Sequence, residues 1–327
     1  MPLSLRRGRV TAVTERLDGL VRLEVDGVAC VSYPRLTGDV EVGDDVLVNE
    51  QARLLELGSG GFDVLYANLT RGLGLGAEPG THVMKLPYTP LQYAVRHAEE
   101  DGGVSESLAG LPVLCCQLLS QLAPACAGLG EGFRLAYVQI PGGALPVSLS
   151  DTLRALRDRG LVDVSVAVGA CTDADVACVS TASALLWAAE QGYEALVCSI
   201  GPGIVGTASP WGHGGLSVAE ALTTAARLGG TPILAVRFSG ADERERHHGL
   251  SHHTRAVLAL AGEALIGWPE GDDPPAELRH ATAVDVTGWE DACAGLPLSH
   301  MGRGPADDPA FFAAAFAAGR LARSFLT

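Results

Sequence analysis

The sequence predicts an α/β protein with a mostly parallel sheet flanked by helices, doubly wound and Rossmann-like, behind a small N-terminal antiparallel β barrel or sandwich. Three observations support this fold class. Two Asp-Gly pairs separate β-rich runs near the N-terminus, a glycine-rich segment follows, and apolar runs then alternate with helical stretches. Since 327 residues suffice for two domains, we predict a small β domain over 1–70 and an α/β domain over 71–327.

Short β-rich runs fill the first 70 residues. Asp18-Gly19 and Asp26-Gly27 separate three of them, and this dipeptide favours tight hairpin turns because it tolerates positive φ at both central positions. The expected strands cover 9–14, 20–25, 28–33, 46–48 and 62–65. They are short and carry few large apolar side chains, so we expect this domain to pack on the α/β domain or on a second subunit.

Alternating apolar and helical segments follow the glycine-rich link at 72–76. The expected strands cover 81–86, 112–117, 134–140, 162–168, 195–200, 232–238, 264–268 and 283–286. Helices are predicted over 217–227 and 254–261, and a last buried helix starts at Pro309 after Asp308 as its N-cap. This alternation predicts a parallel sheet covered on both faces. Eight strands also permit a closed barrel, which remains the alternative.

Composition and charge exclude several classes of function. The formal net charge of −15 argues against nucleic acid and against anionic membranes, because both partners require a basic surface. The sequence contains no run of about 20 apolar residues and no signal-peptide pattern. Its eight cysteines form no CxxC pair, which is typical of reduced, buried thiols. We therefore expect a cytoplasmic protein, and a homodimer because symmetric dimers are the commonest oligomers.

A glycine loop after the apolar run at 195–200 is the first candidate for ligand binding. Its candidate residues are Gly201, Gly203, Gly206 and Thr207. The spacing matches GxGxxG, in which glycines let backbone N–H groups approach an anion. The loop continues to about residue 215 where a dinucleotide motif would already enter its helix. A dinucleotide site, a general anion cradle and a purely structural turn all remain open.

Four histidines lie between residues 247 and 253, just before an apolar helix. Ser251 fits the N-cap of that helix, so His252 and His253 fall in its first turn, where the helix dipole disfavours the protonated ring. Neutral imidazoles there can donate to an anion or bind a metal. With His213 from the glycine loop, these two are the candidate acid–base residues. A zinc site and a structural role in capping and packing are the alternatives.

Polar residues at the ends of other predicted strands complete the candidate site. The candidate ligand-binding residues outside the glycine loop are Lys85, Ser120, Ser251 and Arg303. The carboxyl ends of parallel strands meet at one edge of a sheet, so we expect Lys85, Gly203, His213 and His252 to lie along one concave edge.

Four motifs make the chain similar to an uncharacterised bacterial family, the domain of unknown function DUF3866. They cover 80–92, 201–207, 246–254 and 301–304. The resemblance extends over nearly the whole chain and implies no known activity. At two places this chain departs from the pattern that the resemblance implies. Leu119 stands where a histidine is expected, and 170–175 lacks an expected histidine and glycine pair. If those groups are catalytic in relatives, this member is altered.

The sequence thus favours binding of a small anionic metabolite, phosphate- or nucleotide-like, at the carboxyl edge of the sheet, with possible histidine acid–base catalysis. A non-catalytic assembly protein and a metal-dependent hydrolase are the alternatives. No cysteine or carboxylate has metal-ligand spacing with His252, so we expect no bound metal. No particular cofactor is indicated.

Overall fold

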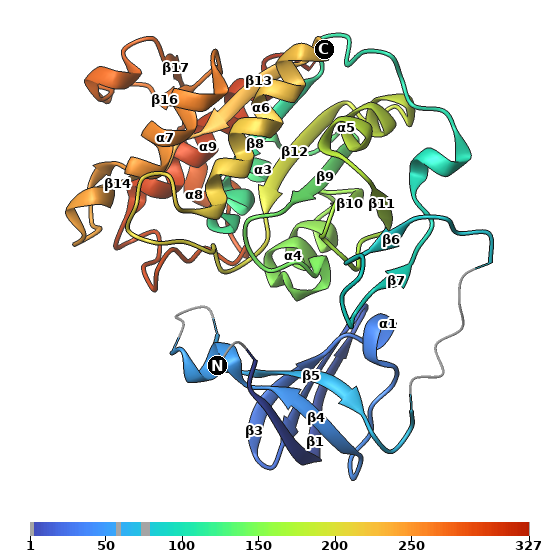
Figure 1. The fold of residues 1–327 in the computed structure, drawn as a ribbon. Helices are drawn as coiled ribbons and strands as arrows, with labels where there is room; N and C mark the ends of the chain where they lie inside the picture. The colour runs from blue at the N-terminus through green and yellow to red at the C-terminus, as the bar shows by residue number, and fades with distance from the viewer. Residues whose placement is uncertain (1–2, 57–59, 73–78, 327) are drawn as a thin grey trace. The chain divides into compact units, whose positions relative to one another are not determined.

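The computed structural model describes residues 3–56, 60–72 and 79–326. Contacts divide the chain into two compact units, Met1–Val95 and Arg96–Thr327 (Figure 1). The change of composition that we expected after residue 70 precedes this division. Most of the glycine-rich link, from residue 73 onward, lies outside the described residues.

A closed five-stranded barrel forms the core of the first unit, in the order β1-β2-β3-β5-β4. The strands are β1 (Leu5–Leu17), β2 (Leu20–Val25), β3 (Val28–Ser32), β4 (Asp45–Asn49) and β5 (Asp63–Asn68). Two short helices, α1 (Pro34–Thr37) and α2 (Gln51–Leu54), lie between strands. The barrel prediction is confirmed, with one difference: β3 and β5 pair parallel, because the chain crosses over through β4 before it returns beside β3.

The predicted strand at 81–86 is wrong as a member of the parallel sheet. Only β6 (Met84–Lys85) forms there, and it pairs antiparallel with β7 (Tyr93–Ala94) inside the first unit. The chain turns directly afterwards, since Leu86 and Tyr88 have positive φ angles of 49° and 59° and Pro87 lies between them. Lys85 therefore does not end a strand of the parallel sheet.

A six-stranded sheet in which every neighbouring pair is parallel forms the second unit, in the order β11-β10-β9-β12-β8-β13. Its strands are β8 (Pro112–Cys116), β9 (Leu135–Ile140), β10 (Val164–Val168), β11 (Val176–Cys178), β12 (Ala195–Ile200) and β13 (Thr231–Ala235). The inner strands are buried at every position, as expected for a sheet covered on both faces. The sheet is open, so the closed-barrel alternative is not the architecture.

Helices flank the sheet and bury two apolar clusters against it. The helices are α3 (Leu122–Leu129), α4 (Asp151–Asp158), α5 (Thr181–Glu190), α6 (Ser217–Arg227), α7 (His252–Ala261), α8 (Trp289–Ala292) and α9 (Pro309–Arg323). One cluster joins strand residues to α3 and to the phenylalanines of α9, and the other joins them to α5 and α6. The bounds predicted for α6 are confirmed. Ser251 caps α7 as predicted, which starts that helix two residues before Thr254.

The last two predicted strands are wrong as members of the main sheet. They form a separate parallel pair, β16 (Gly267–Pro269) with β17 (Thr282–Val284). Leu265 makes one bridge to Ile233 of β13 before the chain leaves the sheet, and α9 packs against β16 instead. Among the residues that the structure describes, no helix is long and apolar enough to cross a membrane.

Close packing of α9 on α3 gives the first testable prediction. A Cβ at Gly319 would lie 2.9 Å from the backbone N of Leu129, far inside normal contact. Gly319→Ala should therefore destabilise the protein by about 1–3 kcal/mol, although helix propensity alone favours alanine by about 1 kcal/mol. Urea unfolding measures the change. Gly240→Ala is the control, since a Cβ there meets nothing within 4 Å. A stabilised Gly319→Ala variant would contradict the packing argument.

Candidate functional site

The carboxyl end of β13 leads into the segment that carries most of the candidate side chains. Two short strands, β14 (Phe238–Ser239) and β15 (Gly249–Leu250), pair antiparallel and close the loop between them. The 3-10 turn η5 (Glu245–His247) lies in this loop, and α7 starts directly after β15. The hairpin-like return places His247 next to the first turn of α7.

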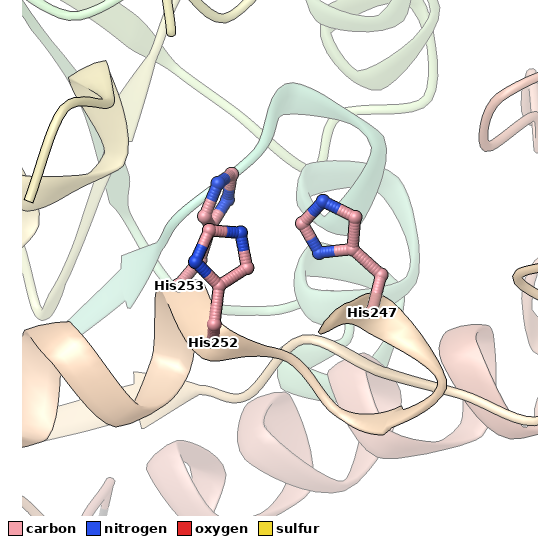
Figure 2. A group of neighbouring side chains, drawn as sticks. All are labelled: His247, His252 and His253. Carbon is pink, nitrogen blue, oxygen red and sulfur yellow. The ribbon is translucent and has the colours of Figure 1, made fainter. Parts of the chain in front are cut away.

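Three histidines converge at this point (Figure 2). His252 and His253 project from the start of α7, and His247 faces them from the preceding turn. One nitrogen of each ring lies within 4.8 Å of one nitrogen of both others. Ring centroids are 4.5 Å apart for His252 and His253, and 4.8 and 4.9 Å from His247 to each of them. We call these three residues the histidine cluster.

His213 reaches the histidine cluster from the glycine loop. It forms a β-bridge with Gly206, and its ring stacks on that of His253 with centroids 3.7 Å apart and planes at 17°. The structure therefore brings together all three candidate acid–base histidines of the sequence, from segments about 40 residues apart.

Ser251 organises the histidine cluster. Its Oγ accepts a hydrogen bond from the backbone N–H of His253 at 3.2 Å, which caps α7, and lies 2.8 Å from His247 Nδ1. One small side chain thereby fixes both the helix start and the ring of His247. The ring nitrogen His252 Nε2 is buried and has no hydrogen-bond partner within the described part of the chain.

Arg237 lies two residues beyond β13 and is 3 % exposed. Its backbone N–H donates to Thr254 Oγ1 at 2.9 Å, which ties the end of the strand to α7. Its Nη1 lies 3.1 Å from His253 Nδ1. Because guanidinium can only donate, Nδ1 is the acceptor and the proton of the neutral ring sits on Nε2. Arg237 thus sets the tautomer of His253.

A network of charges surrounds Arg237. Asp242 accepts from Arg244 at 2.7 Å and from Arg303 at 3.2 Å, and lies 3.5 Å from Arg237. Arg303 also lies 3.5 Å from Asp308. Asp308 occupies the N-cap position of α9 as predicted, yet its carboxylate makes no cap bond and accepts instead from Ser239 Oγ at 2.5 Å. Candidate Arg303 is thereby anchored beside Asp242.

Burial and neighbouring arginines lower the pKa values of these histidines. Burial, then the charges of His213 and Arg237, lower the pKa of His253 to about 2. Burial and Arg237 lower the pKa of His247 to about 3, and burial and His252 lower that of His213 to about 4. Burial, followed by Arg246, also lowers the pKa of His252. All four rings are neutral at pH 7.

Positive charge is poorly compensated in the same region. Burial and the nearby Arg244 lower the pKa of Arg237 to about 10. Burial alone would raise the pKa of Asp242, but hydrogen bonds from Arg244 and the charges around it lower that pKa overall. The carboxylate therefore stays ionised and is shared among several guanidinium groups.

Ser120 contacts a fourth buried histidine of the region. Its Oγ lies 3.2 Å from His300 Nδ1, and the His300 ring stacks on Phe311 with centroids 3.9 Å apart. His300 Nε2 has no hydrogen-bond partner among the described residues. Burial, then Arg237 and Arg303, lower the pKa of His300 to about 3.

The glycines of the loop after β12 mostly allow close backbone packing. A Cβ at Gly201 would meet the Ala144 backbone carbonyl, and one at Gly214 would meet Gly142. The N–H groups of Val205 and Thr207 donate to other backbone carbonyls of this region. Gly203, whose φ is +68°, provides the turn. Part of the backbone that an anion cradle needs is therefore already used.

Sequence reasoning missed several residues that the geometry places in the site. They are Arg237, Asp242, His247 and His300. Arg237 carried a usable signal, since a charge directly after an apolar strand lies at the edge where ligands bind in parallel sheets. The reverse holds for Lys85, which belongs to the first unit and is not placed relative to this site.

The family model described as a protein of unknown function, DUF3866, matches residues 29–319. The chain belongs to this family. The match covers most of the sequence and confirms the resemblance drawn from the four motifs. No curated protein sequence shows significant similarity to the chain. The family description assigns no activity, so function is argued from the geometry of the site.

The lowered pKa of His300 predicts a pH dependence of stability. Below pH 6.5 the unfolded chain binds a proton that the folded protein does not take up until about pH 3, so folding weakens as the pH falls. His300→Gln should make the slope of unfolding free energy between pH 6 and 4 shallower by up to about 1.4 kcal/mol per pH unit. Urea titrations at several pH values measure it. The exposed His280→Gln is the control and should follow the wild type. Equal slopes for His300→Gln and wild type would contradict the assignment.

Proposed function

We propose that the second unit binds a small anionic metabolite, phosphate- or nucleotide-like, at the carboxyl edge of a doubly wound, Rossmann-like sheet. The anion would contact Arg237 and lie beside the histidine cluster. Edge positions of this kind are where parallel α/β sheets bind ligands. The buried arginine supports this proposal more than the glycine loop does.

The observation that carries the proposal is an excess of buried positive charge. Arg237, Arg244 and Arg303 share the carboxylate of Asp242, and Arg303 also contacts Asp308. With neutral histidines around them, these ion pairs hold three positive charges and two negative ones. Arg237 Nε is buried and has no hydrogen-bond partner in the described ranges. A buried guanidinium with a free N–H is stabilised by an anion.

Histidine acid–base chemistry is the second part of the proposal. The Nδ1 of His253 is occupied by Arg237, so this ring offers an N–H rather than a lone pair toward the other rings. His252 Nε2, buried and unpaired among the described residues, is the better proton acceptor. The lowered pKa keeps that ring neutral, and hence able to accept, at pH 7. His213 stacks behind His253 and orients it.

Removing the guanidinium tests the anion site. Wild-type protein at 100 times the dissociation constant of inorganic phosphate should gain about 2.7 kcal/mol of apparent stability. Arg237→Met should weaken phosphate binding at least about tenfold, because it deletes charged hydrogen bonds. Calorimetric titration and thermal melts measure both effects. The control is Arg255→Met, which removes an exposed arginine paired with Glu277. Unchanged phosphate affinity in Arg237→Met would sink the proposal.

A non-catalytic assembly role is the second candidate function. Two observations favour it: Leu119 replaces an expected histidine, and the glycines of the loop serve close packing. In that case the wild type would show no thermal response to phosphate, sulfate or nucleotides.

We further propose that the protein acts in the cytoplasm as a homodimer. All eight cysteines are free and buried, which fits a reducing compartment. Light scattering of the pure protein should give twice the 33.8 kDa chain mass. A monomer at working concentration would remove the dimer from the proposal.

A further inference from the structure

The histidine cluster has the makings of a metal site that the sequence pattern hid. The nitrogens of His247, His252 and His253 lie within 4.8 Å of one another, whereas two ligands of a tetrahedral zinc ion lie about 3.3 Å apart. Small side-chain rotations close that difference. The sequence argued against a metal because Gly249 prevents one helix from holding His248 and His252. The structure uses the turn before β15 instead, and it brings in His247.

Unsatisfied nitrogens point the same way. His252 Nε2 is buried and lacks a hydrogen-bond partner in the described part of the chain. Neither ring nitrogen of His213, stacked against the cluster, has a partner there that meets hydrogen-bond distance and angle, although the Pro210 carbonyl is near enough to favour its charged form. Buried polar atoms are normally paired, so a bound ion explains these gaps. Imidazole ligands select borderline transition metals such as zinc, cobalt or nickel over calcium and magnesium.

We propose that His247, His252 and His253 bind a divalent transition-metal ion, and that Arg237 holds this site closed in the metal-free protein. The contact between Arg237 Nη1 and His253 Nδ1 carries the second half. While it persists, Nδ1 is covered and Nε2 carries the ring proton, so neither nitrogen of His253 can bind a metal. Loading requires that Arg237 leaves and that the ring proton moves from Nε2 to Nδ1, with no net proton released.

This arrangement links the metal to the proposed anion site, and the link rests on that function. The guanidinium released from His253 remains beside the metal, where it can hold an anionic group against the ion. Metal and anion would then favour each other, as in metal-dependent hydrolysis of an anionic substrate.

Titration of chelator-treated full-length protein with Co²⁺ tests the proposal, read by calorimetry and by the visible absorption of nitrogen-bound cobalt. Wild type should bind one equivalent. His252→Ala and His247→Ala should lose at least about tenfold in affinity, while His248→Ala, an exposed neighbour in the same motif, should bind like wild type. Arg237→Met should bind Co²⁺ at least about tenfold more tightly, because it removes a competing charged hydrogen bond. Arg237→Gln replaces it if the methionine variant does not fold.

Two results would overturn the proposal: equal Co²⁺ affinity in His252→Ala and wild type, or unchanged or weaker affinity when Arg237 is replaced. The phosphate titration separates this failure from that of the proposed function. Arg237→Met loses phosphate binding if the anion site is right, whatever cobalt does. The same substitution thus has opposite expected effects on the two ligands.

Discussion

The contact between Arg237 and His253 is the interaction on which the rest of the site depends. It joins the end of a sheet strand to the first turn of a helix, and it decides which nitrogen of His253 carries the proton. The backbone of Arg237 is held by Thr254, and its guanidinium is oriented by Asp242. Every other histidine of the site lies against His253 or against a ring that touches it. A charge buried in this way is stable only while its partners stay in place.

Two chemistries compete for the same few atoms. Neutral imidazoles favour a cation, and under-compensated guanidinium groups favour an anion. Lowered histidine pKa values serve both, since a neutral ring can accept a proton or bind a metal. What separates the two states is the position of one long, flexible side chain. The site therefore behaves as a pair of adjoining half-sites rather than as one rigid pocket.

Local patterns in the sequence predicted local structure well. The Asp-Gly pairs marked the barrel hairpins, apolar runs marked the inner strands, and Ser251 marked the start of α7, because turns, caps and burial are set by neighbouring residues. The runs before Leu86 and at 264–268 are as apolar as true sheet strands, but packing decides membership of a sheet. His247 and Arg237 were missed for a related reason. Their roles come from a chain reversal between β14 and β15 and from a contact across 16 residues, neither of which periodicity records.

The position of α9 has a consequence for how this chain folds during synthesis. Its phenylalanines fill one face of the sheet and its glycine side lies against α3, almost 190 residues earlier. His300, Arg303 and Asp308 come just before it, so the last segment to leave the ribosome carries part of the core and part of the site together. The parallel strands must wait with one face uncovered until then. During that interval the nascent second unit exposes apolar surface, which makes it a natural client for chaperones, whereas the barrel of the first unit can close long before translation ends.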